Sequence, residues 1–519
     1  MSRRILPCGA RIRLLVLVLL AALSLLGLAA GPAHSADRVF VQFLPSAPAS
    51  LDPGKSSRMQ DDQVMWLLYD ALTQLSPAGT EMVPALAERW EQSADGLTTV
   101  FRLRRNVRFH DGSPLDADAV KVSYERQYLR GSPFYAQSPP NVYESVLSGW
   151  IKEIRVQDPH TVAITTHFAR PLQYANVKIV SPQALRKHAG NLSRAPAGTG
   201  PFRLDRWEGS QLSLLPFSDA WHGRPRIDGV RFVFLANNEE AMERMLEGEF
   251  DLLFGVSPDY FEKMSASPGI NLTKVSALNT MFLGMQLERP ALKDRRVREA
   301  IVRGVDRQRL AAILGRGAMI PAKGPLSPGC DGFDPAISQP AYDPERARAL
   351  LKESGAGDAL TLRLLYFNPS ELWSEIVRTI QDYLKKIGIA VQEVKVASWK
   401  DFHEERKKGA HDLYLYKWTV STPDPARFLV GLFQSDSPDN IGRFSHAKVD
   451  ALIKEARGHM EESRRLGLYR EVSRLIAEEV PGLYLFHQIN LAAASTRVKG
   501  LALNAYGLPQ DKLATVELR

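Results

Sequence analysis

The chain has 519 residues and a formal net charge of +8, and hydrophobic residues make up 45% of it. This length is enough for roughly two to four domains with large buried cores, so a small scaffold held together by disulfides is excluded. Lysines and arginines are scattered among acidic residues rather than grouped in a stripe, and this pattern does not support nucleic-acid binding.

The N-terminus predicts a secretory signal that covers residues 1–36. Basic residues precede an apolar run and small residues follow it: Arg3, Arg4, Arg11 and Arg13, then 14–30, then 33–36. We expect cleavage after Ser35 or Ala36, with an uncleaved membrane anchor as the alternative. Removing the signal lowers the formal charge to +4, because it contains four arginines and no acidic residue.

The two cysteines indicate the mode of export and the absence of a disulfide. Cys8 precedes the apolar run, whereas a lipoprotein signal needs a cysteine directly after that run. We therefore expect a free periplasmic protein and not a lipoprotein. Loss of the signal leaves Cys330 alone, so no intrachain disulfide is expected.

The first half of the mature chain predicts short strands with a few helices between them. Alternating large and polar residues predict strands at 38–44, 98–103, 161–166, 211–215 and 230–235. Apolar residues at helical spacing predict helices at 62–75, at 117–128 behind the cap Asp116, and at 239–247. Gly248 ends the last of these before a strand at 250–254.

After Leu278 the predicted helices are longer and alternate with strands, as in an α/β lobe. Asp294 can cap one helix, and a second follows at 371–386. Strands are predicted at 389–396, after a glycine stop, and at 413–418.

Residues 85–128 combine a predicted strand, a turn and a predicted helix in one unit. The residues Trp90, Asp95-Gly96, Leu103, Phe109-His110-Asp111-Gly112 and Tyr124 resemble the consensus of the family 5 extracellular solute-binding proteins. Members of this family deliver peptides, nickel complexes and related solutes to ABC importers. Further similar motifs follow in the family's order at 198–202 (GTGPF), 221–225 (WHGRP), 247–251 (EGEFD), 294–306 (DRRVREAIVRGVD) and 418–429 (WTVSTPDPARFL). The ordered set covers most of the mature chain.

The resemblance implies an α/β, bilobal periplasmic-binding-protein fold of the large, peptide-binding type. It implies two mixed-sheet lobes, an additional N-terminal subdomain and a hinge. We expect lobe I at 37–72, 195–278 and 490–519, with the additional subdomain of lobe I at 73–194, and lobe II at 279–489. The crossings between lobes are expected near 278–281 and 484–488. In such a fold the ligand lies in the cleft between the lobes, and closure buries it from water.

The resemblance places the ligand site at the strand that leads into the WTVSTPDP motif. Peptide-binding members are implied to pair the main chain of this strand with an extended peptide, here at Lys417, Trp418 and Thr419. Trp418 would also offer a flat apolar wall, whereas the plainer interpretation of 413–418 is an ordinary sheet strand. The full set of expected ligand-binding residues is Arg58, Met281, Phe367, Asn368, Lys417, Trp418, Thr419, Ser421 and Thr422.

Two departures from the peptide-binding pattern question an ordinary dipeptide as the ligand. Peptide-binding relatives carry an aspartate that pairs with the α-ammonium group where this chain has Ser421, and serine supplies no charge. A buried ammonium without a counter-ion costs several kcal/mol, unless Asp424 compensates; Asp424 is alternatively a helix cap. The relatives also hold the far carboxylate with an arginine in the segment that matches 366–372, which has none here. Arg58 or Arg427 could meet a carboxylate instead, or could be a solvated surface residue.

Neither catalysis nor a bound metal or cofactor is expected. No histidine pair has the spacing of a zinc site, and no serine lies in a G-x-S-x-G elbow. His110 and Asp111 are expected to form a structural cap rather than an acid-base pair. Cys330 lies in no nucleophile motif.

The sequence therefore predicts a monomeric periplasmic receptor that captures a small molecule or short peptide. Its partner would be the ABC permease complex in the inner membrane, and no nucleic acid is expected to bind. The alternatives are a receptor for a non-peptide solute such as an opine-like compound or a metal chelate, a secreted amide hydrolase on the same scaffold, and a periplasmic chaperone or sensor adaptor.

Overall fold

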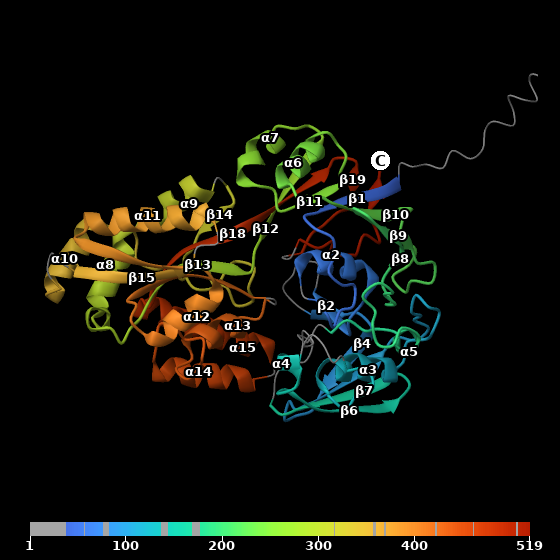
Figure 1. Cartoon of the computed structure of the whole chain (residues 1–519). Coiled ribbons are helices and arrows are strands. Elements are labelled where there is room, and N and C mark those ends of the chain that lie inside the picture. The colour runs from blue at the N-terminus through green and yellow to red at the C-terminus, as the bar shows by residue number, and fades with distance from the viewer. Residues whose placement is uncertain are drawn as a thin grey trace, which may run out of the picture.

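The computed structural model describes residues 38–56, 58–75, 82–135, 144–168, 177–315, 317–356, 360–367, 370–420, 423–459, 461–504 and 507–519. These residues form two lobes with a gap between them, joined by strands at one side (Figure 1). The predicted signal with Cys8, and the expected site residues Asn368, Ser421 and Thr422, lie outside the described residues. Within the described ranges, no helix has the length and apolar character needed to cross a membrane.

One sheet of twelve strands runs through both lobes, in the order β16-β15-β17-β13-β18-β11-β1-β10-β9-β8, with β12 and β14 also paired to β18. Strand β18 (Gly482–Ser495) is the shared element. Its first residues pair with β13 (Asn279–Met285), and its last seven pair with β12 (Ile270–Ser276). The lobes are therefore continuous through one long strand.

Lobe I packs its part of the sheet against helices from distant segments. Strand β1 lies between the parallel strands β10 and β11, and its inward residues Phe40 and Leu44 are fully buried. The elements are β1 (Val39–Leu44), α2 (Met59–Leu68), α5 (Pro182–Lys187), β8 (Phe202–Glu208), β9 (Gln211–Pro216), β10 (Gly229–Phe234), α6 (Asn238–Leu246), β11 (Leu252–Phe254), η3 (Pro258–Tyr260), α7 (Phe261–Ser265), β12, β19 (Val498–Lys499) and β20 (Glu517–Leu518).

A separate four-stranded antiparallel sheet lies below lobe I in Figure 1, with a hydrophobic cluster of its own. Helix α3 covers it, and this helix begins at Asp116, whose carboxylate accepts a hydrogen bond from the amide of Ala119 at 2.8 Å. The elements are β2 (Thr73–Leu75), β3 (Met82–Pro84), β4 (Ala87–Gln92), β5 (Thr98–Leu103), α3 (Ala117–Tyr128), α4 (Glu144–Leu147), β6 (Ile151–Asp158) and β7 (Thr161–Thr166).

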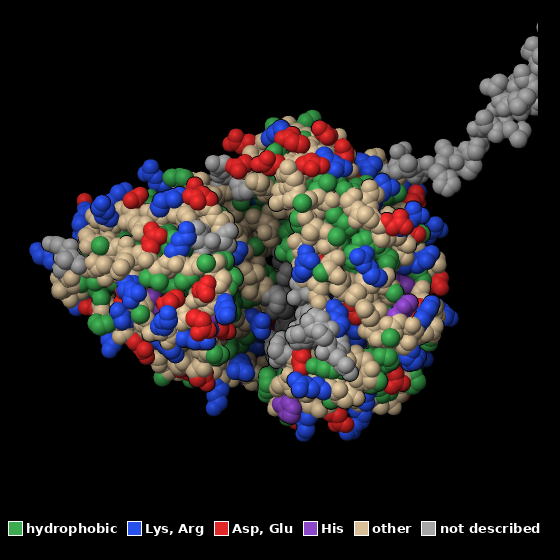
Figure 2. Space-filling model, viewed as in Figure 1, with side chains coloured by type: hydrophobic (Ala, Val, Ile, Leu, Met, Phe, Trp, Pro, Cys, Tyr) green, Lys and Arg blue, Asp and Glu red, His purple; other side chains and the backbone are tan. Residues whose placement is uncertain are grey.

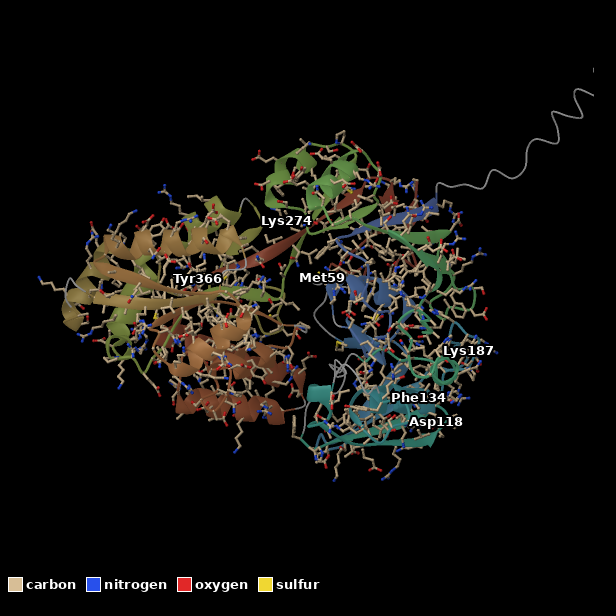
Figure 3. The ribbon with its side chains drawn as sticks, viewed as in Figure 1. Met59, Asp118, Phe134, Lys187, Lys274 and Tyr366 are labelled. Carbon is tan, nitrogen blue, oxygen red and sulfur yellow. The ribbon has the colours of Figure 1, made fainter. Side chains whose placement is uncertain are left out.

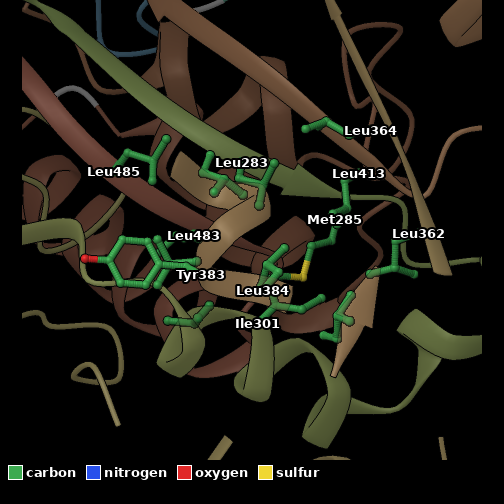
Figure 4. Packing of buried hydrophobic residues seen from close by; sticks show 14 of the residues in the cluster. Leu283, Met285, Ile301, Leu362, Leu364, Tyr383, Leu384, Leu413, Leu483 and Leu485 are labelled. Atoms are coloured by element: carbon green, nitrogen blue, oxygen red, sulfur yellow. The ribbon is translucent and has the colours of Figure 1, made fainter. Parts of the chain in front are cut away.

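Lobe II has helices on both faces of its sheet, and successive side chains along each strand enter opposite cores. In β17, Leu413 and Leu415 enter the core shared with α8, α9, α10 and α11, part of which Figure 4 shows, whereas Tyr414 and Tyr416 enter the core shared with α12 to α15. The elements are β13, η4 (Pro290–Lys293), α8 (Arg295–Gly304), α9 (Arg307–Gly315), β14 (Met319–Pro321), α10 (Pro344–Ser354), β15 (Leu360–Phe367), α11 (Glu371–Lys386), β16 (Ile389–Val396), α12 (Trp399–Lys408), β17 (Leu413–Thr419), α13 (Ala426–Phe433), α14 (Ala447–Gly458) and α15 (Glu462–Glu479).

Most predicted elements are confirmed within two residues, but the helix predicted at 62–75 is wrong at both ends. Helix α2 is Met59–Leu68, and residues 73–75 form β2. The helix ends because Tyr69 is extended, with φ −131° and ψ 155°, and the next residue, Asp70, is drawn into a buried polar cluster. This cluster consists of distant side chains that the local pattern does not contain.

The GTGPF motif is explained by close packing against the end of α2. The amide of Gly200 donates to the carbonyl oxygen of Leu68 at 3.0 Å. A Cβ atom on Gly200 would lie 2.3 Å from the carbonyl oxygen of Leu67, which is backbone and cannot move aside easily. The motif is therefore a contact between main chains and not a phosphate loop.

We expect Gly200→Ala to lower the free energy of unfolding by about 1–3 kcal/mol through overpacking against α2. Gly149→Ala is the matched control, because a Cβ atom there meets nothing within 4 Å. Urea denaturation of both variants measures the difference. An unchanged midpoint for Gly200→Ala would contradict the packing explanation.

The turn that contains His110 and Asp111 is structural, as predicted. The His110 ring contacts Gly200 O through Nε2 at 3.0 Å, and burial lowers the pKa of His110 to about 4. Asp111 accepts hydrogen bonds from both the amide and the hydroxyl of Ser113, and from Ser181 Oγ at 2.5 Å. These side chains hold the turn against the GTGPF loop.

Candidate functional site

The candidate site lies where the two lobes meet, and Figure 2 shows the surface hollowed between them. The crossing strands are tied together at this place: the amide of Ala277 donates to Gln488 O at 3.0 Å. The Asn279 side chain donates to Gln488 Oε1 at 3.1 Å and accepts from the Gln488 amide at 3.2 Å. This pair of amide side chains fixes the base of the gap.

The end of β17 reaches this base. Strand β13 pairs with it along its whole length, from Met285↔Leu413 to Asn279↔Thr419, and the amide of Val420 then donates to Leu278 O at 2.9 Å. On its other edge, β15 pairs with β17 at residues 413 and 414 and no further. Among the described strands, none pairs with this edge at 415–419, which is therefore the stretch where an extended ligand would add as a further strand.

Trp418 is half-buried and lies on the face of β17 that packs toward α13. A Cβ atom on Gly431 would lie 3.1 Å from its ring, so the absence of a side chain there lets the indole lie close to the helix. Its Nε1 is buried and has no hydrogen-bond partner within the described part of the chain. The ring of Tyr416 lies 6.0 Å from it, centroid to centroid. Trp418 is therefore a residue of strand β17 whose indole ring also forms a flat apolar surface over α13.

A pocket of about 320 Å³ opens beside this wall. Most of its lining comes from lobe II and includes Arg427 and Val430 of α13 and Arg457 of α14. Phe168, which follows β7, lines it from the other side, and the guanidinium of Arg457 lies 5.8 Å from the Phe168 ring centroid. Sequence reasoning missed Phe168 and Arg457, because their contact joins distant segments without a local signal.

The other expected residues lie around the same junction or across it. Met281 is 1% exposed and packs into the lobe II core, so the side chain does not reach the gap in this conformation. Phe367 ends β15 with its ring 5.0 Å from that of Trp399. Thr419 is exposed at the end of β17, and Lys417 is half-buried beside it. Of the expected residues, Met281, Lys417, Trp418 and Thr419 therefore lie together on the paired strands β13 and β17.

Arg58 belongs to the opposite lobe. It precedes α2, is exposed, and donates from Nη2 to Ser46 Oγ at 2.8 Å. Its neighbour Met59 is 51% exposed and lies on the side of lobe I that faces the gap (Figure 3). Lobe I therefore presents the exposed apolar side chain of Met59 to the gap, next in sequence to the exposed Arg58.

Asp424 is a helix cap, as one of its two interpretations predicted. Its Oδ1 accepts from the amide of Ala426 at 3.0 Å, at the start of α13, and forms a buried ion pair with Arg465 at 3.3 Å. A carboxylate that is 2% exposed and already paired cannot supply the missing charge at Ser421.

Cys330 is buried in the lobe II core, and its surroundings do not suit a nucleophile. Burial raises the pKa of the Cys330 thiol to about 11, and Ser327 Oγ at 3.5 Å is its hydrogen-bond partner. A thiol in this environment is not a nucleophile at neutral pH. No group of three histidine, cysteine or acidic side chains in the described ranges is placed to hold a metal ion.

Comparisons with known proteins agree with the two-lobed arrangement described above. The profile described as "Bacterial extracellular solute-binding proteins, family 5 Middle" matches residues 81–440. The Di/tripeptide-binding protein 2 of Pseudomonas aeruginosa is 30% identical over 486 residues, which cover 88% of this chain and 91% of that protein. The Heme-binding protein A of Haemophilus influenzae is 27% identical, over 91% of each chain. The solved structure of HbpA2 from Haemophilus parasuis superposes with a TM-score of 0.87 and 27% identity, covering 93% of this chain and 100% of that one. The fold is thus the bilobal one of large periplasmic binding proteins.

Proposed function

We propose, because the chain belongs to family 5 of the bacterial extracellular solute-binding proteins, that it captures a peptide or peptide-like solute between its lobes for an ABC importer. The observation that carries the proposal is the full-length match to a relative named for di- and tripeptides, which extends over 88% of this chain. That match covers a larger share of this chain than the family profile, which matches residues 81–440.

The open edge of β17 supports a peptide-like ligand. A strand edge with free main-chain groups binds an extended peptide through backbone hydrogen bonds, and neighbouring side chains then set selectivity. Lys417, Trp418 and Thr419 lie on this edge, and Met59 lies across the gap. Closure of the lobes around such a ligand would complete the site from both sides.

The finer proposal is that ordinary dipeptides with a free amine are poor ligands. Ser421 offers no charge to an α-ammonium group, and the nearby Asp424 is occupied by Arg465. Unpaired burial of the ammonium costs several kcal/mol. A peptide whose amine is blocked avoids this cost.

In a thermal-shift comparison, we expect acetyl-Ala-Ala to raise the melting temperature more than Ala-Ala at the same concentration. A ligand present at 100 times its Kd stabilises the native state by about 2.7 kcal/mol, so the shift reports affinity. Calorimetric titration with each peptide gives the two Kd values. A selective, strong shift with Ala-Ala would contradict the proposed role of Ser421.

A receptor for a non-peptide solute is the second candidate. It is favoured by the relative named for heme, which matches this chain over as large a share of its length as the peptide-named relative does. Mass spectrometry of small molecules released from the purified, denatured protein distinguishes the candidates. A co-purifying non-peptide compound that added peptides do not displace would favour the second candidate.

The family consists of solute-binding proteins rather than enzymes, and we propose that this chain likewise catalyses no reaction. We also propose that it is exported by the signal at 1–36, without a lipid anchor, and acts as a periplasmic monomer with an inner-membrane permease. The lobe division at residues 278 and 489 stays part of the proposal, and the change of partner of β18 from β13 to β12 supports it.

A further inference from the structure

Lys417 differs from the other lysines that are shielded from solvent. In the described ranges, the lysines that are not exposed are Lys55, Lys121, Lys178, Lys417 and Lys512. Four of these interact with a carboxylate: Lys55 with Asp52, Lys121 with Glu125, Lys178 with Asp62, and Lys512 with Asp70. Lys417 has neither an ion pair nor a hydrogen bond with any described residue.

The surroundings of Lys417 are apolar. It pairs with Met281 across β13 and β17, and Met281 pairs in turn with Phe486 of β18. Because paired residues point to the same face, Lys417 continues the row of Leu413 and Leu415 that enters the lobe II core. Thr419, which is exposed at the end of β17, follows Lys417 in the same row.

The electrostatics agree with this placement. Desolvation lowers the pKa of Lys417, and no neighbouring charge raises or lowers it further. A partly buried ammonium without an acid nearby is unfavourable in the ligand-free protein. A carboxylate brought by a ligand would supply the missing partner in a medium of low dielectric constant, where such a contact is strong.

A purely structural role is the plain alternative. The aliphatic part of a lysine can cover apolar surface while the ammonium stays in water. In that case the lysine would stabilise the free protein and would not affect ligand choice. The two roles therefore differ in ligand preference when the charge is removed and the stem is kept: the preference for an anionic ligand is lost in the first role and does not depend on Lys417 in the second.

We propose that the Lys417 ammonium is the anion-binding group of the cleft, and that the ligand carries a carboxylate or a similar anionic group at the end of β17. The proposal rests on the proposed function, because it assumes that the ligand lies between the lobes. It names the charge class of the solute, and it gives a positive reason for excluding an α-ammonium group from this end of the site.

The binding test uses the full mature chain and three probes: acetyl-Ala-Ala, the neutral acetyl-Ala-Ala-amide, and glutarate as an anion without a peptide bond. Calorimetry should show that the wild-type protein binds acetyl-Ala-Ala at least tenfold more tightly than the amide. Lys417→Met should abolish this preference, and Lys454→Met, which removes an exposed charge on α14 of the same lobe, should retain it.

The outcomes separate this inference from the proposed function. Binding of glutarate but of neither peptide would keep the role of Lys417 and overturn the peptide-like ligand. Equal or tighter binding of the amide, or an unchanged preference in Lys417→Met, would overturn the role of Lys417 and keep the peptide. Binding of none of the three probes would overturn both.

A second measurement tests Lys417 without any ligand. The ligand-free Lys417→Met variant should melt at the same temperature as the wild-type protein or above it, because an unpaired charge is removed and the apolar stem is retained. A lower melting temperature would show that the ammonium stabilises the fold, and would overturn the proposal.

Discussion

Replacing Lys512 by methionine is expected to lower the free energy of unfolding by about 3–5 kcal/mol, because it leaves the Asp70 carboxylate buried without its nearest cation. Lys512 Nζ forms an ion pair with Asp70 and also donates to the carbonyl oxygen of Tyr69. Lys512 is 3% exposed and Asp70 is 1% exposed. Water therefore cannot replace the lost partner without opening the cluster.

The cluster joins segments that are far apart in sequence. Asp70 follows α2, and its carboxylate accepts from Thr199 Oγ1 at 2.8 Å and from Trp221 Nε1 at 2.9 Å. His222 Nε2 lies 3.1 Å from the other carboxylate oxygen. Loss of Lys512 from the C-terminal segment should thus weaken the packing of three other segments of lobe I.

The destabilisation should depend on pH. Burial alone would raise the pKa of Asp70, but Lys512 and His222 hold it well below its usual value. In the wild-type protein this stabilisation is fully present above the pKa of an unfolded aspartate, about 3.9, and is lost as the pH falls through the lower folded-state pKa. In Lys512→Met the main group that lowers this pKa is absent, so Asp70 takes up a proton at a higher pH. The deficit relative to wild type should therefore shrink from pH 7 toward pH 4.

Urea denaturation at both pH values measures this difference. Lys499→Met is the control, because it removes an exposed lysine from the same C-terminal segment. The double variant Asp70→Asn with Lys512→Met should lose less stability than the sum of the single variants, since the charges are removed together. A deficit below about 1 kcal/mol at pH 7, or additive losses, would contradict an essential ion pair.

Elements with a local end signal could be predicted from the sequence. Asp116 and Asp294 cap their helices through the backbone amides of Ala119 and Arg296. The helix 371–386 and the strand after it have the predicted bounds. Capping depends on a few neighbouring residues, so no distant contact was needed to find these ends.

Elements whose ends are set by distant contacts could not be predicted in this way. The end of α2 depends on the polar cluster around Asp70 and on the close approach of Gly200. The apolar pattern of 62–75 continues past that point, so periodicity alone extends the helix too far. The competing interactions come from residues more than a hundred positions away.

In the candidate site, too, features with a local signal could be predicted, and features that depend on distant contacts could not. The strand at 413–418 and the cap at Asp424 were found from motif and pattern. The Phe168–Arg457 contact was not, because it joins the two lobes and neither residue lies in a motif. The isolation of Lys417 was not visible either, since the lack of a counter-ion depends on what surrounds a side chain in space.

Trp418 forms one wall of the pocket beside β17. Trp418→Ala is expected to weaken binding of acetyl-Ala-Ala by roughly tenfold to a hundredfold, because a half-buried indole next to an open pocket contributes much of the apolar contact in such sites. Trp207→Ala is the control for general loss of packing, since Trp207 is also half-buried but lies in β8 of lobe I. That control should bind the probe with unchanged affinity.

Trp418→Phe separates the ring from its polar group. The variant keeps an aromatic wall over Gly431 and removes the Nε1 donor, which is buried and without a partner among the described residues. An orphaned buried donor costs about 1–3 kcal/mol, so its removal offsets the smaller ring, and the free energy of unfolding should stay within about 1 kcal/mol of wild type. If the indole acts as a wall, calorimetry will show Trp418→Phe binding nearly as tightly as wild type. Equal loss of affinity in the phenylalanine and alanine variants would instead identify Nε1 as a ligand donor, and unchanged affinity in Trp418→Ala would place the ligand elsewhere in the gap.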